Sequence, residues 1–312
     1  MLLRVSTGER RAILRAMAMV ASGDRRGALS PADELAIASA NRIVFGADEP
    51  TEPRSLVPIT PAELSAALER DETAAIAGRV LAIMALVDGV LDADRLSAAL
   101  RFAAALGLRE QYLVDLAEAA RGHLAWVGAD LTRQNVLSIT GGQTADLPLL
   151  PYRDAPDAAL VERYRALSRY PRGTLGREFL EWYADHRYPI PGEALSLNER
   201  FVRPHDSTHL ISGYSTTPDG EILVSTFTSG MMGMDQPLGA HILPALLSLH
   251  VGVRINDVAG AWHCNLDPAA LWRAWDRGAA CRTNIFAAEW DFWRLAAVPL
   301  GELRQSYAVP PL

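Results

Sequence analysis

Residues 60–100, TPAELSAALERDETAAIAGRVLAIMALVDGVLDADRLSAAL, decide the fold class of this chain. The stretch opens with Thr60-Pro61, a capping hydroxyl followed by proline at the first helical position, and Glu63 completes a capping box. Apolar residues then recur every three or four positions, at Ile76, Val80, Ile83, Met84 and Val87. This spacing predicts an amphipathic helix that ends at Asp88-Gly89.

Helical signals continue outward in both directions. Ser30-Pro31 repeats the capping pattern, Ile13 and Met17 have the spacing of an earlier helix, and a later helix is expected around residues 112–124. Strand-type alternation is rare and strands do not alternate with helices, which excludes a doubly wound nucleotide-binding fold. We therefore predict an all-α fold made of two helical modules.

The predicted boundary between the modules is the segment 138–157, SITGGQTADLPLLPYRDAPD. It is rich in Gly, Pro, Asp and Thr and has no helical periodicity, as is typical of a linker. We predict a helical accessory domain over residues 1–137, a linker over 138–157 and a second helical domain over 158–312.

Composition limits the classes of function. The chain has 312 residues, 49% of them hydrophobic and 21% charged, with a net charge of −7. A core-forming composition excludes a disordered chain, and the acidic total argues against a nucleic-acid partner. Only Cys264 and Cys281 are present. We therefore expect free thiols and a cytoplasmic protein. Peripheral attachment to the inner face of the membrane is the alternative localisation.

The stretch 222–253 is nearly uncharged, because Asp235 is its only formal charge. It contains no clear membrane-spanning helix. Two interpretations stay open: buried helices of the core, or an apolar groove or membrane-facing surface that takes a lipid-like ligand.

The turn Asp88-Gly89-Val90-Leu91-Asp92-Ala93-Asp94 gathers three carboxylates between two predicted helices. Val90 stands where a calcium loop needs an oxygen ligand, so we interpret the segment as a tight turn whose Asp92 or Asp94 caps the next helix. The sequence around it, ALVDGVLDADRLSAALRFAAALGL, resembles the tellurite-resistance B-like (TerB-like) helical module over residues 60–125. That resemblance implies an accessory or interaction role, with divalent-metal contacts at the turn as an option.

The segment 200–225, RFVRPHDSTHLISGYSTTPDGEILVS, carries the strongest chemical pattern. His205, Asp206 and His209 fall within an arc of about 100° if they share a helix, and we expect Pro204 in the first turn of that helix. Gly213 can end the helix, and a turn at 217–220 can bring Glu221 back beside His209. Two imidazoles and two carboxylates suit a divalent ion such as Zn²⁺, Fe²⁺ or Mn²⁺. The alternative is a histidine pair on a partly exposed helix.

This pattern, His-Asp-x-x-His with Glu eleven residues later, resembles the signature of the coenzyme Q biosynthesis protein 4 family. Two further elements are similar to that family: residues 171–179, PRGTLGREF, and residues 289–307, EWDFWRLAAVPLGELRQSY. The resemblance extends over residues 140–312. The family's usual N-terminal helices are replaced here by the TerB-like module.

The resemblance implies an all-helical domain and a metal, usually zinc, held by His205, Asp206, His209 and Glu221, with iron, manganese or magnesium as alternatives. It implies a polyprenylated aromatic substrate and removal of the ring carboxylate of a prenylated hydroxybenzoate in ubiquinone biosynthesis. It also implies a membrane-associated complex with other quinone-biosynthesis proteins. We add the expectation of a homo-oligomer.

Two other sequence features are candidates for function. Arg177 is expected in the first turn of a helix, where the dipole disfavours a cation, so it needs an anionic partner. That partner is either a carboxylate of the protein or an anionic group of the substrate. His263-Cys264 could bind a metal or form a nucleophile–base pair, but no spaced partner accompanies it and we interpret it as an apolar turn.

Three functions remain open from the sequence. The first is a metal-dependent lyase, a decarboxylase of prenylated aromatic acids, with Arg177 as carboxylate anchor. The second is a phosphohydrolase of the His-Asp type, which would have to recruit His186 and Asp257. The third is a non-catalytic prenyl-lipid-binding scaffold, in which the metal is structural.

Overall fold

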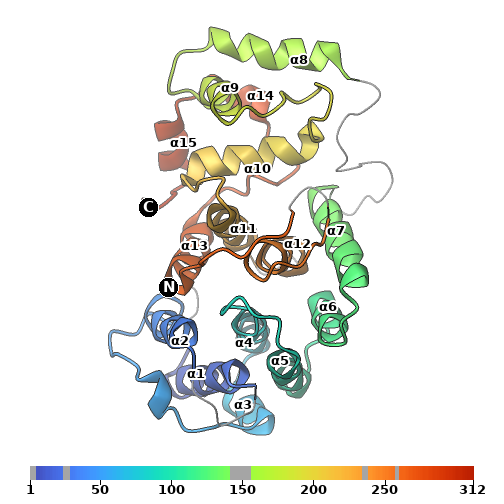
Figure 1. Cartoon of the computed structure of the whole chain (residues 1–312). Helices are drawn as coiled ribbons and strands as arrows, with labels where there is room; N and C mark the ends of the chain where they lie inside the picture. Colours follow the sequence, from blue (N-terminus) through green and yellow to red (C-terminus); the bar gives the residue numbers. More distant parts are fainter. Residues whose placement is uncertain (1–4, 24–28, 141–155, 234–237, 257–259) are drawn as a thin grey trace. The chain divides into compact units, whose positions relative to one another are not determined.

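The computed structural model describes residues 5–23, 29–140, 156–233, 238–256 and 260–312. These residues form fifteen α-helices and no sheet, so the predicted all-α class is confirmed (Figure 1). The bounds of the helices are α1 Thr7–Ala21, α2 Pro31–Ile43, α3 Pro61–Ala67, α4 Asp71–Met84, α5 Ala93–Ala105, α6 Gln111–Ala120, α7 Leu124–Thr140, α8 Ala158–Arg165, α9 Leu175–His186, α10 Glu199–Ser212, α11 Pro218–Met232, α12 Leu238–Ala245, α13 Pro268–Ala280, α14 Phe292–Leu295 and α15 Leu300–Ser306.

The chain divides into two compact units. The first unit contains residues 1–135 and 217–279, and the second contains residues 136–216 and 280–312. The sequence suggested a different division, at the segment 138–157, with everything after it in one domain. Residues 217–279 instead group with the N-terminal helices. Residues 138–140 of the expected linker end α7, and residues 141–155 lie outside the described part.

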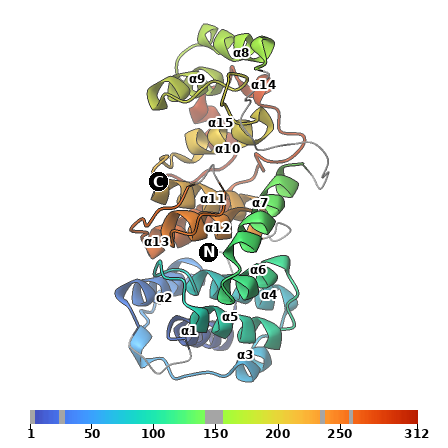
Figure 2. The same ribbon diagram turned by 45° about the vertical axis from the view of Figure 1, so that its right-hand side comes forward.

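In the first unit, α1, α3, α4 and α5 pack on one another around one hydrophobic core (Figure 2). Ser6, Ser30 and Thr60 each form a complete capping box, and α2 and α3 begin where the sequence predicts. Helix α4 lies deep in this core, because the side chains of Ile76, Val80 and Ile83 are all buried. The apolar stripe read from the sequence is therefore the centre of this core.

The uncharged stretch 222–253 belongs to the same core. Ile222, Leu243 and Leu246 are fully buried and join the cluster built by α1 and α4. The core interpretation of this stretch is confirmed for its described residues; residues 234–237 lie outside them. Among the described helices, none is both long and apolar enough to cross a bilayer.

The acidic turn between α4 and α5 is a structural device of the first unit. The Asp92 carboxylate accepts hydrogen bonds from the backbone N–H groups of Asp94 and Arg95, which confirms the predicted cap of α5. The Arg95 side chain, 5% exposed, pairs with Asp33 at 2.6 Å and with Asp88. It also donates to the carbonyl of Met84 at 2.8 Å. The Arg95 guanidinium therefore compensates the negative charges of Asp33 and Asp88.

The second unit is built around aromatic rings. Helix α9 packs on α10 and α14, and α10 packs on α15. Tyr164, Phe179 and Phe292 are buried at its centre, with ring centroids 4.9–6.2 Å apart. Backbone bonds from Leu175 and Gly176 to the segment 296–298 attach the start of α9 to the C-terminal helices. This packing fixes α9, which carries Arg177, and α10, which carries His205, Asp206 and His209.

Candidate metal centre

Helix α10 carries His205, Asp206 and His209, and it begins earlier than the sequence suggested. The Asn198 side chain accepts from the Arg200 N–H and caps a helix that starts at Glu199. Pro204 therefore lies inside the helix, and its predicted place in the first turn is wrong. The physical reason is that a good cap six residues upstream outweighs one missing backbone N–H.

His205 and His209 face each other one turn apart on α10. Their Nε2 atoms are 3.3 Å apart. The Phe201 ring stacks on His205 with centroids 5.1 Å apart and a 15° angle, and the Trp182 ring lies 5.8 Å from His209. Aromatic neighbours on both imidazoles restrict the rotation of the two rings.

The outer nitrogen of His209 has a backbone partner. Its Nδ1 lies 3.0 Å from the carbonyl oxygen of Tyr214, which follows Gly213 at the end of α10. Since a carbonyl only accepts, this contact places a proton on Nδ1. In the neutral ring the lone pair then lies on Nε2, the atom that faces His205. Such a backbone contact is typical of histidines that bind metals.

Glu221 lies where the sequence placed it, in the first turn of α11. Thr217 caps that helix through the Gly220 N–H, and Pro218 occupies its first position. His205, His209 and Glu221 are together a group of residues that could hold a metal ion. This His/Glu cluster has the donor types to hold a divalent metal ion.

Asp206 makes a different contact from the two histidines beside it. It is 7% exposed, and its Oδ2 accepts a hydrogen bond of 2.5 Å from the hydroxyl of Tyr183 on α9. Asp206 is not one of the three clustered residues. Its predicted role as a ligand stays a prediction.

Arg177 has partners within the protein. Its Nε donates to Glu181 at 2.7 Å, one turn along α9, and another nitrogen donates to the Ser168 carbonyl. Glu178 accepts from the Gly173 N–H at 2.7 Å and so serves the start of the helix. The carboxylate partner expected for Arg177 is therefore present as Glu181, and a substrate contact stays a prediction.

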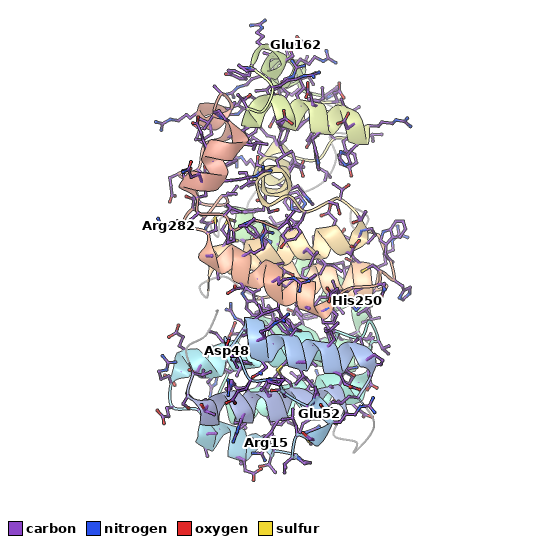
Figure 3. All side chains as sticks on the ribbon, turned by 90° about the vertical axis from the view of Figure 1, so that its left-hand side faces the viewer. Arg15, Asp48, Glu52, Glu162, His250 and Arg282 are labelled. Carbon is purple, nitrogen blue, oxygen red and sulfur yellow. The ribbon has the colours of Figure 1, made fainter. Side chains whose placement is uncertain are left out.

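The other candidate histidines are not in the cluster. His186, which the phosphohydrolase pattern would require, is exposed and contacts the carbonyl of Trp182. Asp257, the other residue of that pattern, lies outside the described residues. His250, labelled in Figure 3, is buried between the carbonyls of Val87 and Cys264. Burial raises the pKa of the Cys264 thiol, which is the opposite of what a nucleophile needs.

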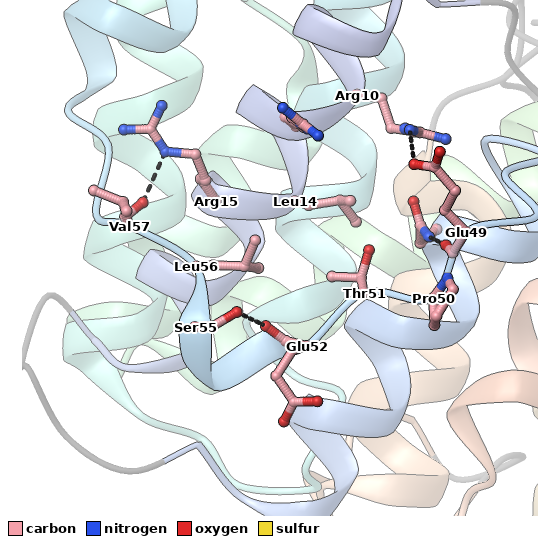
Figure 4. A pocket seen from close by; sticks show the side chains of 12 residues that line it. Arg10, Leu14, Arg15, Glu49, Pro50, Thr51, Glu52, Ser55, Leu56 and Val57 are labelled. Atoms are coloured by element: carbon pink, nitrogen blue, oxygen red, sulfur yellow. Dashed lines mark hydrogen bonds and ion pairs between the residues drawn. The ribbon is translucent and has the colours of Figure 1, made fainter.

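Two cavities, one in each unit, have the size of ligand sites. The cavity of about 570 Å³ in the first unit lies beside Arg10, Arg15 and Glu49 (Figure 4). Arg15 donates to the Val57 and Pro58 carbonyls there, so its charge serves the fold. The cavity of about 540 Å³ in the second unit is mostly apolar and is lined by Tyr183 of α9 and by residues 187–190 and 193–195.

Part of the chain matches a curated protein of Danio rerio, "Ubiquinone biosynthesis protein COQ4 homolog, mitochondrial", at 27% identity over 156 residues. The predicted relationship to the COQ4 family is thereby confirmed. The match covers 42% of this chain and 58% of the COQ4 homolog, so the chain spans little more than half the length of this relative. No family model matches the chain.

A solved structure was also compared with the chain. It is the crystal structure of a candidate ubiquinone biosynthesis protein from Nostoc punctiforme PCC 73102, 18% identical to this chain. The alignment covers 77% of this chain and 96% of the other, with a TM-score of 0.34. The similarity to the COQ4 homolog therefore rests on the sequence match of 27% over 156 residues.

Two features of the centre were not identified from the sequence. The Tyr214 carbonyl is a backbone group, and side-chain patterns carry no signal for it. Tyr183 is 23 residues from Asp206, and only the packing of α9 on α10 shows that they meet.

Proposed function

We propose that this chain binds a divalent metal ion, zinc in the first instance, through His205, His209 and Glu221, with Asp206 as a further ligand. The observation that carries the proposal is the separation of 3.3 Å between the two Nε2 atoms. Zinc–nitrogen bonds of about 2.0–2.1 Å at a tetrahedral angle place two histidine nitrogens about 3.4 Å apart. The pair therefore has the spacing of two zinc ligands, and the Tyr214 carbonyl directs the lone pair of His209 to the same point.

The charges of the donor set also fit a cation. Two neutral imidazoles with Glu221 leave a charge of about −1 for a divalent ion to offset. In the metal-free protein, the Nε2–H of His205 can donate to the lone pair of His209. A metal ion bound to Nε2 of His205 would require this neutral ring to carry its proton on Nδ1 instead. Since metals bind the neutral form of imidazole, protons compete with the ion, and we expect metal affinity to fall as the pH is lowered.

We further propose that the protein acts in ubiquinone biosynthesis and removes the ring carboxylate of a prenylated hydroxybenzoate. In this reaction the bond from ring to carboxylate breaks, CO₂ leaves and a proton takes its place on the ring. A bound divalent ion would supply electrostatic stabilisation of charge on a substrate oxygen. The support for this assignment is the relation to the COQ4 homolog, whose name assigns it to ubiquinone biosynthesis.

The second unit also offers a place for the apolar part of such a substrate. Its cavity of about 540 Å³ is within the range of ligand pockets, and Leu180, Pro189 and Ile190 line it. Tyr183 belongs both to this cavity and to the hydrogen bond with Asp206. A prenyl chain in the cavity would exclude water from that side of α9. Other quinone-biosynthesis proteins, a second copy of the chain and a membrane surface are the partners proposed with this role.

The test combines metal analysis with turnover. Purified protein is dialysed against zinc, and its metal content is compared with that of His205→Ala and His209→Ala. His186→Ala is the matched control, because it removes an exposed histidine outside the cluster. We expect close to one zinc per chain in the parent and control, and loss of zinc from both variants. Equal zinc content in all four proteins would overturn the site.

Turnover is then measured as CO₂ release from a prenylated hydroxybenzoate labelled in its carboxylate. Release by the parent that is lost in His209→Ala supports the decarboxylase. Stoichiometric zinc and bound prenyl lipid without CO₂ release would instead support a scaffold of the quinone pathway.

A further inference from the structure

A buried hydrogen bond connects the histidine helix to its neighbour. The Tyr183 hydroxyl on α9 donates to Oδ2 of Asp206 on α10 at 2.5 Å. The two residues are only 4% and 7% exposed. Asp206 directly follows His205 and lies three residues before His209. The bond therefore restrains the helical turn that carries both imidazoles.

The packing of the Tyr183 ring allows its hydroxyl little freedom. The ring stacks on Phe179 with centroids 4.8 Å apart and meets Tyr188 edge-on at 6.1 Å. A ring held in this way is a directional donor, because its hydroxyl can point only toward Oδ2 of Asp206.

We propose that Tyr183 is a positioning residue of the metal centre: by donating to Oδ2 of Asp206 it orients this carboxylate and fixes the turn of α10 that presents His205 and His209. The inference rests on the proposed metal site, because it concerns how α10 presents the ligands of that site. Partners of this kind orient ligands and raise metal affinity.

The chain provides a matched control in Tyr164. Its hydroxyl donates to Glu199 at 3.2 Å, so it also makes a hydrogen bond, here partly buried, from a tyrosine to a carboxylate of α10. Glu199 is the first residue of that helix, whereas Asp206 lies beside the histidines. Tyr183→Phe and Tyr164→Phe therefore remove the same type of interaction from two places on one helix.

The experiment measures zinc affinity by competition with a chromophoric chelator, together with urea unfolding of the metal-free proteins. We expect Tyr183→Phe to bind zinc about 10–100-fold more weakly than the parent. Tyr164→Phe should bind zinc as the parent does, although both variants lose stability. Equal zinc affinity of Tyr183→Phe and the parent would overturn the inference and leave the metal site standing. A parent that binds no zinc would overturn both.

A double-mutant cycle separates positioning from packing. If Tyr183 acts through Asp206, adding Tyr183→Phe to Asp206→Ala changes zinc affinity by less than about twofold, because the hydrogen bond is already lost. Losses that add in the double variant would show that Tyr183 acts through the packing of α9, and this outcome overturns the inference even where the single variant binds zinc weakly.

Discussion

The turn after α4 and the C-terminal half of α10 both concentrate polar side chains, and they treat them in opposite ways. In the first, Arg95 lies among Asp33, Asp88 and the Met84 carbonyl, so the protein supplies its own cation. In the second, His205 and His209 direct nitrogens at each other across 3.3 Å. A cluster of ligating groups stabilises the fold when a cation of the protein itself offsets its charge, as Arg95 does. It is a candidate site for a metal ion when its donor atoms converge on one point, as those of His205 and His209 do.

The comparison also separates the two kinds of carboxylate. Desolvation raises the pKa of Asp88, and the Arg95 guanidinium and the Val90 N–H oppose that shift, so the charge of Asp88 depends on partners within the protein. Asp206 is held by a neutral hydroxyl, which orients a carboxylate without cancelling its charge. The four predictions below test this contrast, from the largest expected effect to the smallest.

Replacing the internal cation should have the largest effect. Arg95→Met leaves two carboxylates in a buried region without their partner, and we expect the free energy of unfolding to fall by about 3–5 kcal/mol. Urea unfolding measures the change. Arg54→Met is the control, because Arg54 is 64% exposed and pairs with Glu34 at the surface, where about 0–1 kcal/mol is expected. Equal losses in both variants would contradict the assigned role of Arg95.

Zinc should stabilise the folded protein through the site that contains the histidine pair and not through the acidic turn. At a free zinc concentration 100 times the dissociation constant, binding adds about 2.7 kcal/mol to the free energy of unfolding. Thermal melts with zinc and with chelator should differ for the parent and for Asp94→Asn, since the acidic turn takes no part. They should coincide for His209→Ala. A zinc effect lost in Asp94→Asn would place the ion at the turn.

A third polar cluster should show a dependence on pH. Asp115 is 1% exposed, and the Gln134 amide donates to it at 2.7 Å and to Asp130 at 2.9 Å. Desolvation raises the pKa of Asp115 to about 7. An unfolded aspartate has a pKa of about 3.9. The unfolded chain therefore releases this proton first as the pH rises, and stability is lost between about pH 4 and pH 7.

The measurement is urea unfolding of the parent and of Asp115→Asn at pH 5 and pH 8. The parent should lose about 2 kcal/mol more than the variant over this interval, since the amide does not titrate. Parallel pH profiles would show that Asp115 is ionised in the folded protein at pH 5.

The smallest effect is expected at Arg177. Its ion pair with Glu181 spans one turn of α9, and both side chains are about a quarter to a third exposed. Arg177→Met should therefore cost less than about 1 kcal/mol of stability. A variant of unchanged stability with a raised KM for the prenylated acid would support the predicted role as carboxylate anchor. An unchanged KM would restrict Arg177 to its ion pair.

The sequence predicted local features well because local physics determines them. The caps at Ser30, Thr60 and Asp92 and the end of α10 at Gly213 depend on a few neighbouring residues. The grouping of residues 217–279 with the N-terminal helices depends on contacts between distant residues, which periodicity does not encode. The start of α10 was misplaced because Pro204 was treated as a signal for a first turn, whereas the Asn198 cap determines it.

The same distinction applies to the centre. His205 and His209 were predictable because one helix carries both at a spacing of one turn. Tyr183 was not, because the packing of two helices determines its contact with Asp206. The spacing of a motif thus gives the donor atoms, and tertiary packing gives the partners that orient them.

Gly213 connects the end of a helix to the acid–base chemistry of a side chain. Its φ of 84° reverses the chain so that the next carbonyl, that of Tyr214, points back at Nδ1 of His209. A residue with a Cβ would be strained there and would come within 2.8 Å of the Leu312 side chain. If the chain left the helix in another direction, His209 would be free to carry its proton on the other nitrogen. The backbone torsion of one glycine thereby selects the tautomer of an imidazole four residues away, and with it the basicity of the atom offered to a metal.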